Sequence, residues 1–388
     1  MSGVVVIGGG PAGAASAILL ARAGRAVTLL ERESGPHDKV CGEFISHEAA
    51  AYLAALGVDL SALGAVPIRH TRLAGRHGET RIALPFAASS LSRRRLDEAL
   101  LQLAADAGVE VRLGIRARRM ARDGDGWRIG VDDGALHASS VFLAVGKHDL
   151  KGWKRPPGLQ SDLVGFKMHL RLAPAEAAAL DRHVELILFP GGYAGLEPIE
   201  DGLANLCLLV RRSALPKGEV WPELLALIRT ACPLLDRRLE GAQPLWPKPL
   251  AITAIPYGHV QKSANGVWRL GDQAAVIPSF AGDGMAIALH SAHVAAAAYL
   301  EGGTAETYQR RMARDLGLQV LGATLLSQAL VRPWGQAALT SLARLQPRLM
   351  TAAAARTRIS EKALERTLPQ PRGLSFQSRP GPSGNTLP

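Results

Sequence analysis

Residues 4–32 read VVVIGGGPAGAASAILLARAGRAVTLLER, and this stretch decides the fold. Residues 4–7 are apolar and β-branched, as in a fully buried parallel strand. Residues 14–23 have helical composition and stop at a glycine. Residues 26–30 form a second apolar run that predicts another buried strand. The stretch therefore predicts one strand–helix–strand unit of a parallel sheet.

A glycine motif, G-x-G-x-x-G at Gly8, Gly10 and Gly13, joins the first strand to the helix. These glycines permit a tight turn, a close approach of pyrophosphate to the backbone, and close helix–strand packing. The helix N-terminus offers free N–H groups to the phosphates. Glu31 follows the second strand, where a carboxylate can accept hydrogen bonds from ribose hydroxyls. The complete context favours a dinucleotide, NAD(P) or FAD, over a glycine-rich turn without a ligand.

Composition describes an ordinary globular chain that is long enough for two domains. The 388 residues are 47% hydrophobic and 20% charged. The formal net charge is +11, and residues 301–388 hold 12 Lys and Arg against 5 Asp and Glu. Such a surface can face anionic lipid, an acidic partner or phosphorylated ligands. Nucleic acid is not expected as a partner, because no basic helix interleaved with aromatic residues occurs.

Cysteine usage and hydropathy indicate a cytoplasmic protein. The three cysteines are odd in number and lack metal-binding spacing, so neither a disulfide framework nor a metal site is expected. The first strand begins within a few residues of the start, so no signal peptide is expected. No apolar run reaches the length of a membrane span. Residues 316–331 predict a packed amphipathic helix, with a membrane-surface helix as the alternative.

Two further segments follow the first unit. Residues 33–46 form a loop rich in Gly, Pro and charge that ends at a plausible helix cap, Ser46. Cys41 lies on this loop, near the expected ligand crevice, unless it is simply a buried small side chain. Residues 91–114 predict a helix and a strand, and three adjacent arginines open that helix although its dipole disfavours cations there. We expect Arg93 to face an anion.

The middle and later parts of the chain differ in pattern. Residues 127–131 and 141–145 predict further strands. Residues 163–210 alternate between apolar and polar side chains around a turn-rich centre, which predicts an antiparallel sheet forming a second domain. Residues 266–297 again give a strand, a glycine-rich turn and an Ala-rich helix. The N-terminus of that helix would point at an electron-rich group.

Six ordered motifs resemble those of FAD-dependent oxidoreductases with the para-hydroxybenzoate hydroxylase fold, and most resemble the geranylgeranyl reductase family. The first is the fingerprint at residues 8–13 with Glu31. The others are KVCGEF at 39–44, SRRRLD at 92–97, FLAVG at 142–146, GGYAGLEP at 191–198 and GDQAAVIPSFAGDGM at 271–285. Together they cover roughly residues 3–300 in order, which is more specific than any single motif.

The resemblance implies an α/β fold with five segments. Residues 1–160 and 263–300 would form a Rossmann-type FAD-binding domain, and residues 161–262 an inserted antiparallel β-sheet substrate domain. Residues 301–372 would be a C-terminal helical region. We expect residues 373–388, which are rich in Ser, Gly and Pro, to be a disordered tail.

The resemblance also implies that FAD is the cofactor. Its contacts would be Gly8, Gly10, Pro11, Ala12, Gly13, Glu31, Arg32, Arg93, Gly146, Asp272, Gly282, Gly284 and Met285. A reduced flavin is anionic around N1, and the last three residues would place a helix N-terminus at that edge, where it stabilises negative charge. An NAD enzyme does not need this second motif, so FAD is preferred over NAD(P).

The chain departs from the family pattern at the expected substrate pocket. Tyr193 is retained there, but Gly195 and Glu197 stand where the family has Trp and Phe, so the pocket is reshaped and can carry a charge. Residues 147–149 replace the Asp-Gly dipeptide that flavin hydroxylases use with NADPH. No second dinucleotide fingerprint occurs, so NAD(P)H would dock transiently, or a redox partner would deliver electrons. The Trp-x-Trp-x-Ile-Pro motif of flavin halogenases has no match.

Three functions are open at this point. The first is reduction of a C=C bond in a hydrophobic small molecule by flavin hydride, with Cys41 as proton donor or as a group that tunes the flavin. The second is a monooxygenase that hydroxylates an aromatic or polyketide-like substrate. The third is a non-catalytic FAD-binding or membrane-tethered scaffold. The Cys41 loop and the missing Asp-Gly favour the reductase. A peripheral membrane contact would run through the basic C-terminal region.

Overall fold

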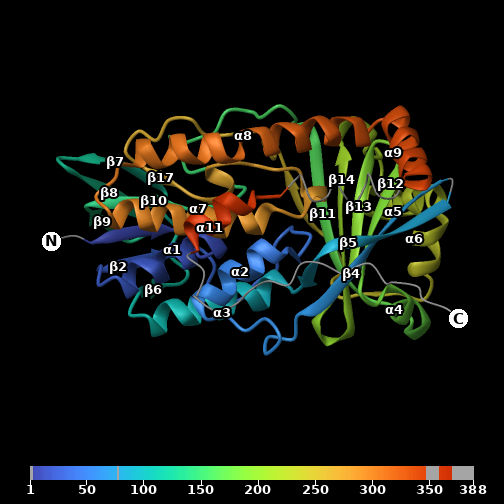
Figure 1. Cartoon of the computed structure of the whole chain (residues 1–388), viewed down its shortest axis with the longest axis horizontal. Coiled ribbons are helices and arrows are strands. Elements are labelled where there is room, and N and C mark those ends of the chain that lie inside the picture. The colour runs from blue at the N-terminus through green and yellow to red at the C-terminus, as the bar shows by residue number, and fades with distance from the viewer. Residues whose placement is uncertain (1–2, 77, 347–357, 369–388) are drawn as a thin grey trace, which may run out of the picture.

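Two large sheets lie side by side along the long axis of the molecule (Figure 1). The structure, a computed structural model, describes residues 3–76, 78–346 and 358–368. The disordered tail predicted for residues 373–388 lies outside the described residues, as do residues 347–357.

The first sheet is parallel and contains the predicted strand–helix–strand unit. Its strand order is β17-β10-β1-β2-β6. The strands are β1 (Val4–Ile7), β2 (Val27–Leu30), β6 (Glu110–Arg112), β10 (Ser140–Leu143) and β17 (Trp268–Arg269). Every residue of β1 is buried, as the β-branched run predicted, and β1 occupies the centre of the sheet. The Rossmann-type core is confirmed.

Side chains alternate between two packed faces of the parallel sheet. Val4 and Val6 face a core formed with the helices α1 (Pro11–Arg22), α2 (His47–Leu56), α3 (Arg93–Asp106) and α7 (Gly284–Leu300). Val5 and Ile7 face a small three-stranded sheet. Its strands are β7 (Arg119–Asp123), β8 (Gly126–Val131) and β9 (Gly134–Ala138). The strand predicted at residues 127–131 therefore belongs to this covering sheet.

The second large sheet has nine strands and is mainly antiparallel. Its order is β15-β11-β14-β13-β12-β4-β5-β3, with β16 paired to β11. Four strands match the predicted stretch: β11 (Leu163–Arg171), β12 (His183–Phe189), β13 (Gly192–Ile199) and β14 (Leu203–Arg211). Two short strands follow later in the chain, β15 (Gln243–Pro244) and β16 (Leu250–Thr253). A 3-10 turn, η1 (Glu200–Gly202), joins β13 to β14.

The sheet also takes three strands from the first 160 residues, which the sequence assigned to the FAD-binding domain. These are β3 (Phe44–Ile45), β4 (Val66–Gly75) and β5 (Gly78–Ser90). Strand β4 pairs in parallel with β12, so the two parts of the chain share one sheet. The boundary at residue 160 therefore does not separate two sheets, because strand pairing joins segments that are distant in sequence.

The two faces of this sheet differ in chemistry. One face carries apolar side chains of β11, β13 and β14 and packs against α5 (Val220–Ala231), α6 (Pro233–Arg238) and α4 (Pro174–Leu180). The alternate residues of the same strands include Lys167, His169, Glu197 and Asn205, all buried. Period-two alternation thus places a row of polar groups on the side opposite α5 and α6.

Three C-terminal helices complete the described chain: α8 (Ala305–Leu330), α9 (Pro333–Leu345) and α11 (Glu361–Thr367). Helix α8 runs along both sheets (Figure 1). Its residues Leu316 and Val320 join the core of the parallel sheet, whereas Leu330 joins a core that includes Tyr193. The packed helix predicted at residues 316–331 is confirmed.

Several apolar side chains of α8 and α9 remain exposed, among them Leu318, Leu325, Trp334 and Leu345. None of the helices that the structure describes has both the length and the hydropathy of a membrane span. A peripheral membrane contact stays a prediction.

Candidate functional site

A cavity of about 650 Å³ opens at the carboxyl ends of the parallel strands and extends toward β16. It is bordered by both glycine motifs, by the Cys41 loop and by the start of α7. The predicted cofactor residues that line it are Gly8, Gly10, Pro11, Ala12, Glu31, Arg32, Arg93, Gly146, Asp272, Gly282, Gly284 and Met285. Gly13 lies just behind them. The predicted cofactor residues thus lie around one cavity, and their roles stay predictions.

The first glycine motif forms an open cradle at the N-terminus of α1. Gly8 has φ 111°, which side-chain-bearing residues rarely adopt. A Cβ on Gly13 would lie 1.8 Å from the carbonyl oxygen of Gly8, so only glycine permits this approach of helix to strand. Helix α1 begins at Pro11 after Gly10, and no side chain caps its N-terminus. Its first N–H groups are thus available to an anion in the cavity.

Glu31 and Arg32 follow β2 at the same end of the cavity. The Glu31 carboxylate is buried and accepts hydrogen bonds from the backbone N–H of Gly9 at 2.8 Å and of Glu33 at 3.1 Å. It therefore holds the glycine loop as well as bordering the cavity. Arg32 pairs with Glu33 at 2.9 Å and lies 3.2 Å from the ring nitrogen of His148.

Arg93 begins α3 and already has an anion within the protein. Its guanidinium donates two hydrogen bonds to Asp97, at 2.9 and 2.8 Å, and Lys39 donates to the same carboxylate at 2.8 Å. Burial would lower the pKa of Arg93, but Asp97 and then Cys41 outweigh burial, and the pKa lies above its usual value. The cation expected at this helix start is therefore stabilised by the carboxylate one turn later.

The second glycine motif ends at the N-terminus of α7. Two 3-10 turns, η3 (Gly271–Gln273) and η4 (Ser279–Ala281), lead to it. Gly282 has φ 70°, and a Cβ there would lie 2.8 Å from the Phe44 ring, so glycine is required. No side chain caps α7. Backbone N–H groups at this end can therefore stabilise negative charge in the cavity.

Asp283, between the two glycines of this motif, faces away from the cavity. It accepts a hydrogen bond from Gln319 at 2.9 Å and pairs with Arg358, which precedes α11. Burial raises the pKa of Asp283 to about 7, against the opposing effect of Arg358. Arg358 of the C-terminal segment thus binds the second motif on the side away from the cavity, a contact that sequence analysis missed.

The Cys41 loop lies between the cavity and the antiparallel sheet. Of the three cysteines, all within the described residues, Cys41 lines the cavity. Its Sγ accepts a hydrogen bond from the Glu43 N–H at 3.4 Å and interacts with Arg93. A guanidinium and a backbone N–H both stabilise a thiolate. Cys41 therefore borders the cavity with a guanidinium and a backbone N–H at its sulfur.

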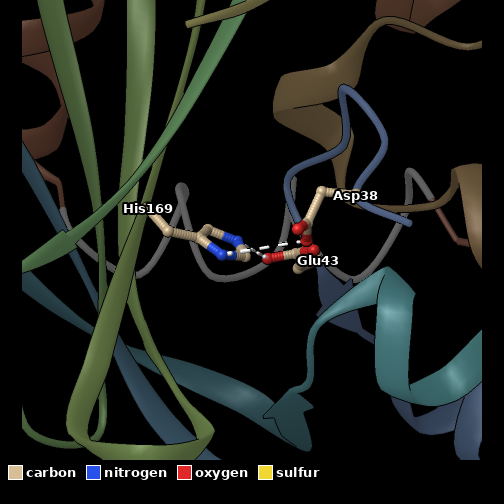
Figure 2. A group of neighbouring side chains, drawn as sticks. All are labelled: Asp38, Glu43 and His169. Atoms are coloured by element: carbon tan, nitrogen blue, oxygen red, sulfur yellow. Dashed lines mark hydrogen bonds and ion pairs between the residues drawn. The ribbon is translucent and has the colours of Figure 1, made fainter. Parts of the chain in front are cut away.

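Glu43 stands where the similar loop of the geranylgeranyl reductase family has glycine, and it keeps a left-handed backbone with φ 61°. Its carboxylate accepts hydrogen bonds from Lys167 Nζ at 2.5 Å and from the backbone N–H of Arg93 at 2.8 Å. His169 Nε2 lies 2.8 Å from the other oxygen. Figure 2 shows His169 reaching from the sheet toward Glu43 and Asp38. All three partners of this ion-pair cluster, Glu43, Lys167 and His169, are buried.

Burial opposes ionisation of Glu43, but His169 and Lys167 outweigh it and lower the pKa of that carboxyl. Sequence analysis missed this cluster. Two indications were available: a charged residue at a glycine position, and a lysine and a histidine two residues apart within an apolar strand.

The atoms of Asp38, Glu43 and His169 lie within 4.8 Å of one another, a spacing that could hold a metal ion. The Lys167 ammonium, however, lies 2.5 Å from Glu43 and 3.8 Å from Asp38. A metal ion would have to displace this internal cation, so the residues present fit an ion pair better than a metal site.

The predicted substrate residues lie on β13, on the sheet face that carries the cluster. Tyr193 is buried, and its ring contacts Phe280 of η4 at 5.8 Å between centroids. A Cβ on Gly195 would be in ordinary contact with the carbonyl oxygen of Cys207, at 3.9 Å. Glu197 exposes 3% of its surface, and burial, followed by the charge of Glu43, raises its pKa well above the usual value. All three lie on one face of the sheet, but none of them is among the residues that border the cavity, so a substrate contact at these positions stays a prediction.

Residues 147–149 occupy the position of the hydroxylase Asp-Gly dipeptide. Lys147 donates a hydrogen bond to the Val40 carbonyl at 2.9 Å, and so supports the Cys41 loop. Asp149 accepts from Arg155 at 2.7 Å. These residues are engaged within the chain and border the cavity.

Comparison with known proteins agrees with this geometry. An FAD binding domain family model matches residues 1–140. A menaquinone reductase of Mycobacterium tuberculosis is 28% identical over 314 residues, covering 76% of this chain and 75% of the relative. A digeranylgeranylglycerophospholipid reductase of Methanopyrus kandleri is 29% identical over 329 residues, covering 79% of this chain and 80% of the relative.

Solved structures share the fold. A myxobacterial chondrochloren halogenase described as FAD-dependent superimposes with a TM-score of 0.73 and 20% identity, covering 94% of this chain and 95% of its own. At this identity the likeness shows the fold alone. The uncapped ends of α1 and α7, the glycine cradle and the Glu31 carboxylate together fit FAD.

Replacing Glu31 by alanine tests the FAD contact. Loss of the carboxylate removes hydrogen bonds to the glycine loop and to the expected ribose, so FAD affinity should fall by about 1–3 kcal/mol. Fluorescence titration of apoprotein with FAD measures it. The control is Glu110→Ala, an exposed carboxylate on β6. Equal FAD affinity in Glu31→Ala and wild type would place the ribose elsewhere.

Replacing Glu43 by glutamine tests the ion-pair cluster. It leaves Lys167 buried without its carboxylate, so stability should fall by about 3–5 kcal/mol at neutral pH. Because the folded-state pKa of Glu43 is lowered, its contribution is present above the usual pKa of 4.5 and is lost as pH falls below that value. The free energies of unfolding of variant and wild type, measured in urea, should therefore become similar at acidic pH. Glu79→Gln, at an exposed site, is the control and should change little.

The resemblance seen in the sequence motifs is confirmed by the fold, the FAD-domain match and the relatives together. A parallel-sheet dinucleotide cradle, a second glycine motif and a large companion sheet meet at one cavity. The chain is an FAD-dependent oxidoreductase with the fold of hydroxylase-type flavoproteins, and its sequence is similar to menaquinone and digeranylgeranylglycerophospholipid reductases.

Proposed function

We propose that this protein reduces a C=C bond in a hydrophobic small molecule. The observation that carries the proposal is the Cys41 thiol at the cavity wall, with Arg93 and the Glu43 N–H at its sulfur. Reduction of a C=C bond needs a proton beside the hydride, and this thiol can release one. The reductase names of two relatives that span about three quarters of the chain support the same class of reaction.

When bound, FAD supplies hydride transfer. The residues of the chain bind and orient the reactants and stabilise charge. The N-termini of α1 and α7 stabilise negative charge at the two ends of the cavity. Arg93 and the Glu43 N–H stabilise the thiolate that remains after Cys41 has given up its proton. Leu250, Ala251 and Ile252 of β16 border the cavity on the side of the antiparallel sheet and provide a wall against which a substrate would lie.

The electron donor is part of the proposal. No second dinucleotide fingerprint occurs in the sequence, and residues 147–149 are engaged with Val40 and Arg155. NAD(P)H therefore docks transiently, or a redox partner protein delivers the electrons.

The alternative function is a flavin monooxygenase. It is supported by the hydroxylase-type fold that this chain shares with flavin enzymes of other chemistries, and a fold by itself does not select between reactions. The two functions differ in their need for O₂, which gives a direct test.

The test begins with anaerobic, dithionite-reduced holoprotein mixed with menaquinone-4 or geranylgeraniol. The reductase predicts reoxidised flavin and a product that has gained two hydrogens, as detected by mass spectrometry. A product that forms only after air is admitted, and that contains an added oxygen atom, would establish the monooxygenase instead.

Cys41→Ser tests the role of the thiol. Serine keeps the size of the side chain but loses thiolate character, so kcat should fall at least about tenfold while FAD content and folding stay unchanged. The matched control is Cys232→Ala, in the core behind the sheet. Cys207 is a poorer control because it pairs with Gly195 across β13 and β14. Normal turnover in Cys41→Ser would show that the thiol takes no part in the reaction and that Cys41 serves only in packing.

A further inference from the structure

The outer side of α8 carries a row of exposed apolar side chains. Helix α8 lies along an outer edge of the molecule (Figure 1). Leu318, Leu321 and Leu325 are exposed, Leu318 to 85%. They are spaced three and four residues apart, so they lie on one side of the helix. Leu316 and Val320, on the other side, belong to the core of the parallel sheet. This part of α8 therefore has one packed side and one exposed apolar side.

Two further exposed apolar side chains extend this row. Leu159 is more than half exposed and lies beside α8, because Gln328 donates a hydrogen bond to its carbonyl oxygen at 2.9 Å. Trp334 is 62% exposed and lies in the first turn of α9, just after α8 ends. A single exposed leucine needs no explanation, but apolar side chains grouped along one helix mark an interaction site. The leucine face is defined here as Leu159, Leu318, Leu321, Leu325 and Trp334.

The charges along α8 and α9 beside the leucine face are almost all positive. Residues 310–346 hold five arginines and one carboxylate, Asp315. The Asp315 side chain is only 7% exposed, and it pairs with Arg311 and Arg314. Arg314 lies one helical turn before Leu318, on the same side of α8, and 71% of its side chain is exposed. A cation therefore lies at the N-terminal end of the leucine face.

A second cation lies at the other end of the leucine face. Arg332 lies between α8 and α9, and its side chain has no hydrogen-bond or ion-pair partner among the residues that the structure describes. It borders a surface cleft of about 320 Å³ together with Leu159 and Arg211. Because Arg211 already pairs with Asp162 at 2.8 Å, the charge in this cleft that can bind an external anion comes from Arg332.

This combination of apolar and cationic side chains is complementary to a membrane with anionic lipids. Leucine side chains of a helix that lies in the membrane interface enter the boundary between headgroups and acyl chains, while arginines pair with phosphates. Tryptophan is enriched at the same depth. A second copy of the chain fits less well. A symmetric contact would bring the arginines of the two copies together, and residues 316–346 hold no carboxylate to pair with them.

We propose that the leucine face docks this protein on a membrane that contains anionic lipids, with Arg314 and Arg332 against the lipid phosphates. None of the described helices is long and apolar enough to cross a membrane, so the contact is interfacial. The inner side of α8 and α9 shares a core with Val276, which borders the cofactor cavity. Docking through this face brings the cavity near the membrane, whichever reaction the flavin performs.

Co-sedimentation of the full-length holoprotein with vesicles tests the docking. The vesicles contain phosphatidylglycerol and phosphatidylcholine in equal amounts, or phosphatidylcholine alone. Wild type should bind the mixed vesicles at least about tenfold more tightly, because the exposed arginines are attracted to anionic lipid. Salt at about 1 M should remove most of this difference by screening. Absence of binding to the mixed vesicles would overturn the proposal.

Leu318→Gln combined with Leu325→Gln tests the apolar part of the face. Both side chains are exposed and glutamine is a good helix former, so folding and FAD content should stay unchanged. Affinity for the mixed vesicles should fall at least about tenfold, because apolar area that would enter the membrane is lost. The matched control is Leu227→Gln, an exposed leucine on α5, which should bind like wild type. Unchanged binding in the double variant, or an equal loss in the control, would contradict the proposal.

Arg314→Gln combined with Arg332→Gln tests the charges. Affinity for the mixed vesicles should fall at least about fivefold, and affinity for phosphatidylcholine alone should stay within about twofold of wild type. An equal loss on both kinds of vesicle would remove the role assigned to lipid phosphates and would overturn that part of the proposal.

Sedimentation velocity without vesicles tests a second copy of the chain as the occupant. Wild type and the Leu318→Gln, Leu325→Gln variant should have the same oligomeric state. A wild-type dimer that these two substitutions convert to a monomer would show that the leucine face binds another copy, and it would overturn the membrane proposal.

Discussion

The buried pairing of Glu43 with Lys167 and His169 joins the two halves of this protein. Glu43 belongs to the loop after β2 of the parallel sheet, and its partners belong to β11 of the antiparallel sheet. A left-handed backbone at a residue with a side chain costs about 1–2 kcal/mol. Such a conformation persists only where the surroundings require it. Here the requirement is electrostatic, because leaving the buried Lys167 ammonium without its carboxylate would cost more free energy than the left-handed backbone of Glu43 does.

This constraint fixes the loop that borders the cofactor cavity. The Asn205 amide donates a hydrogen bond to the Cys41 carbonyl, and Lys147 donates one to the Val40 carbonyl. Together with the pairing of Glu43, these contacts hold one short segment in place. The thiol of Cys41 is thereby held near Arg93, which Asp97 in turn orients. Positions at the cavity wall therefore depend on contacts made in the companion sheet. Movement of either sheet would shift the thiol relative to the cofactor.

The fold accommodates several flavin chemistries, so function must reside in such local groups. Halogenases share the architecture at low identity, whereas the reductases resemble the chain along three quarters of its length. What distinguishes this chain is a second charge system on the sheet. Burial, and then the nearby charge of Glu43, raises the pKa of Glu197, whereas His169 and Lys167 lower that of Glu43.

The sequence by itself determined the strand–helix–strand unit, both glycine motifs and four strands of the antiparallel sheet, β11 to β14. These follow from local rules: period-two and helical patterns, and positions where only glycine fits, such as Gly13 and Gly282. Tertiary structure alone decided which distant residues meet. Glu43 finds Lys167 more than a hundred residues later, β4 pairs with β12, and Arg358 reaches Asp283. Local patterns do not encode such pairings, because strand order and the burial of charge are settled only when separate segments pack together.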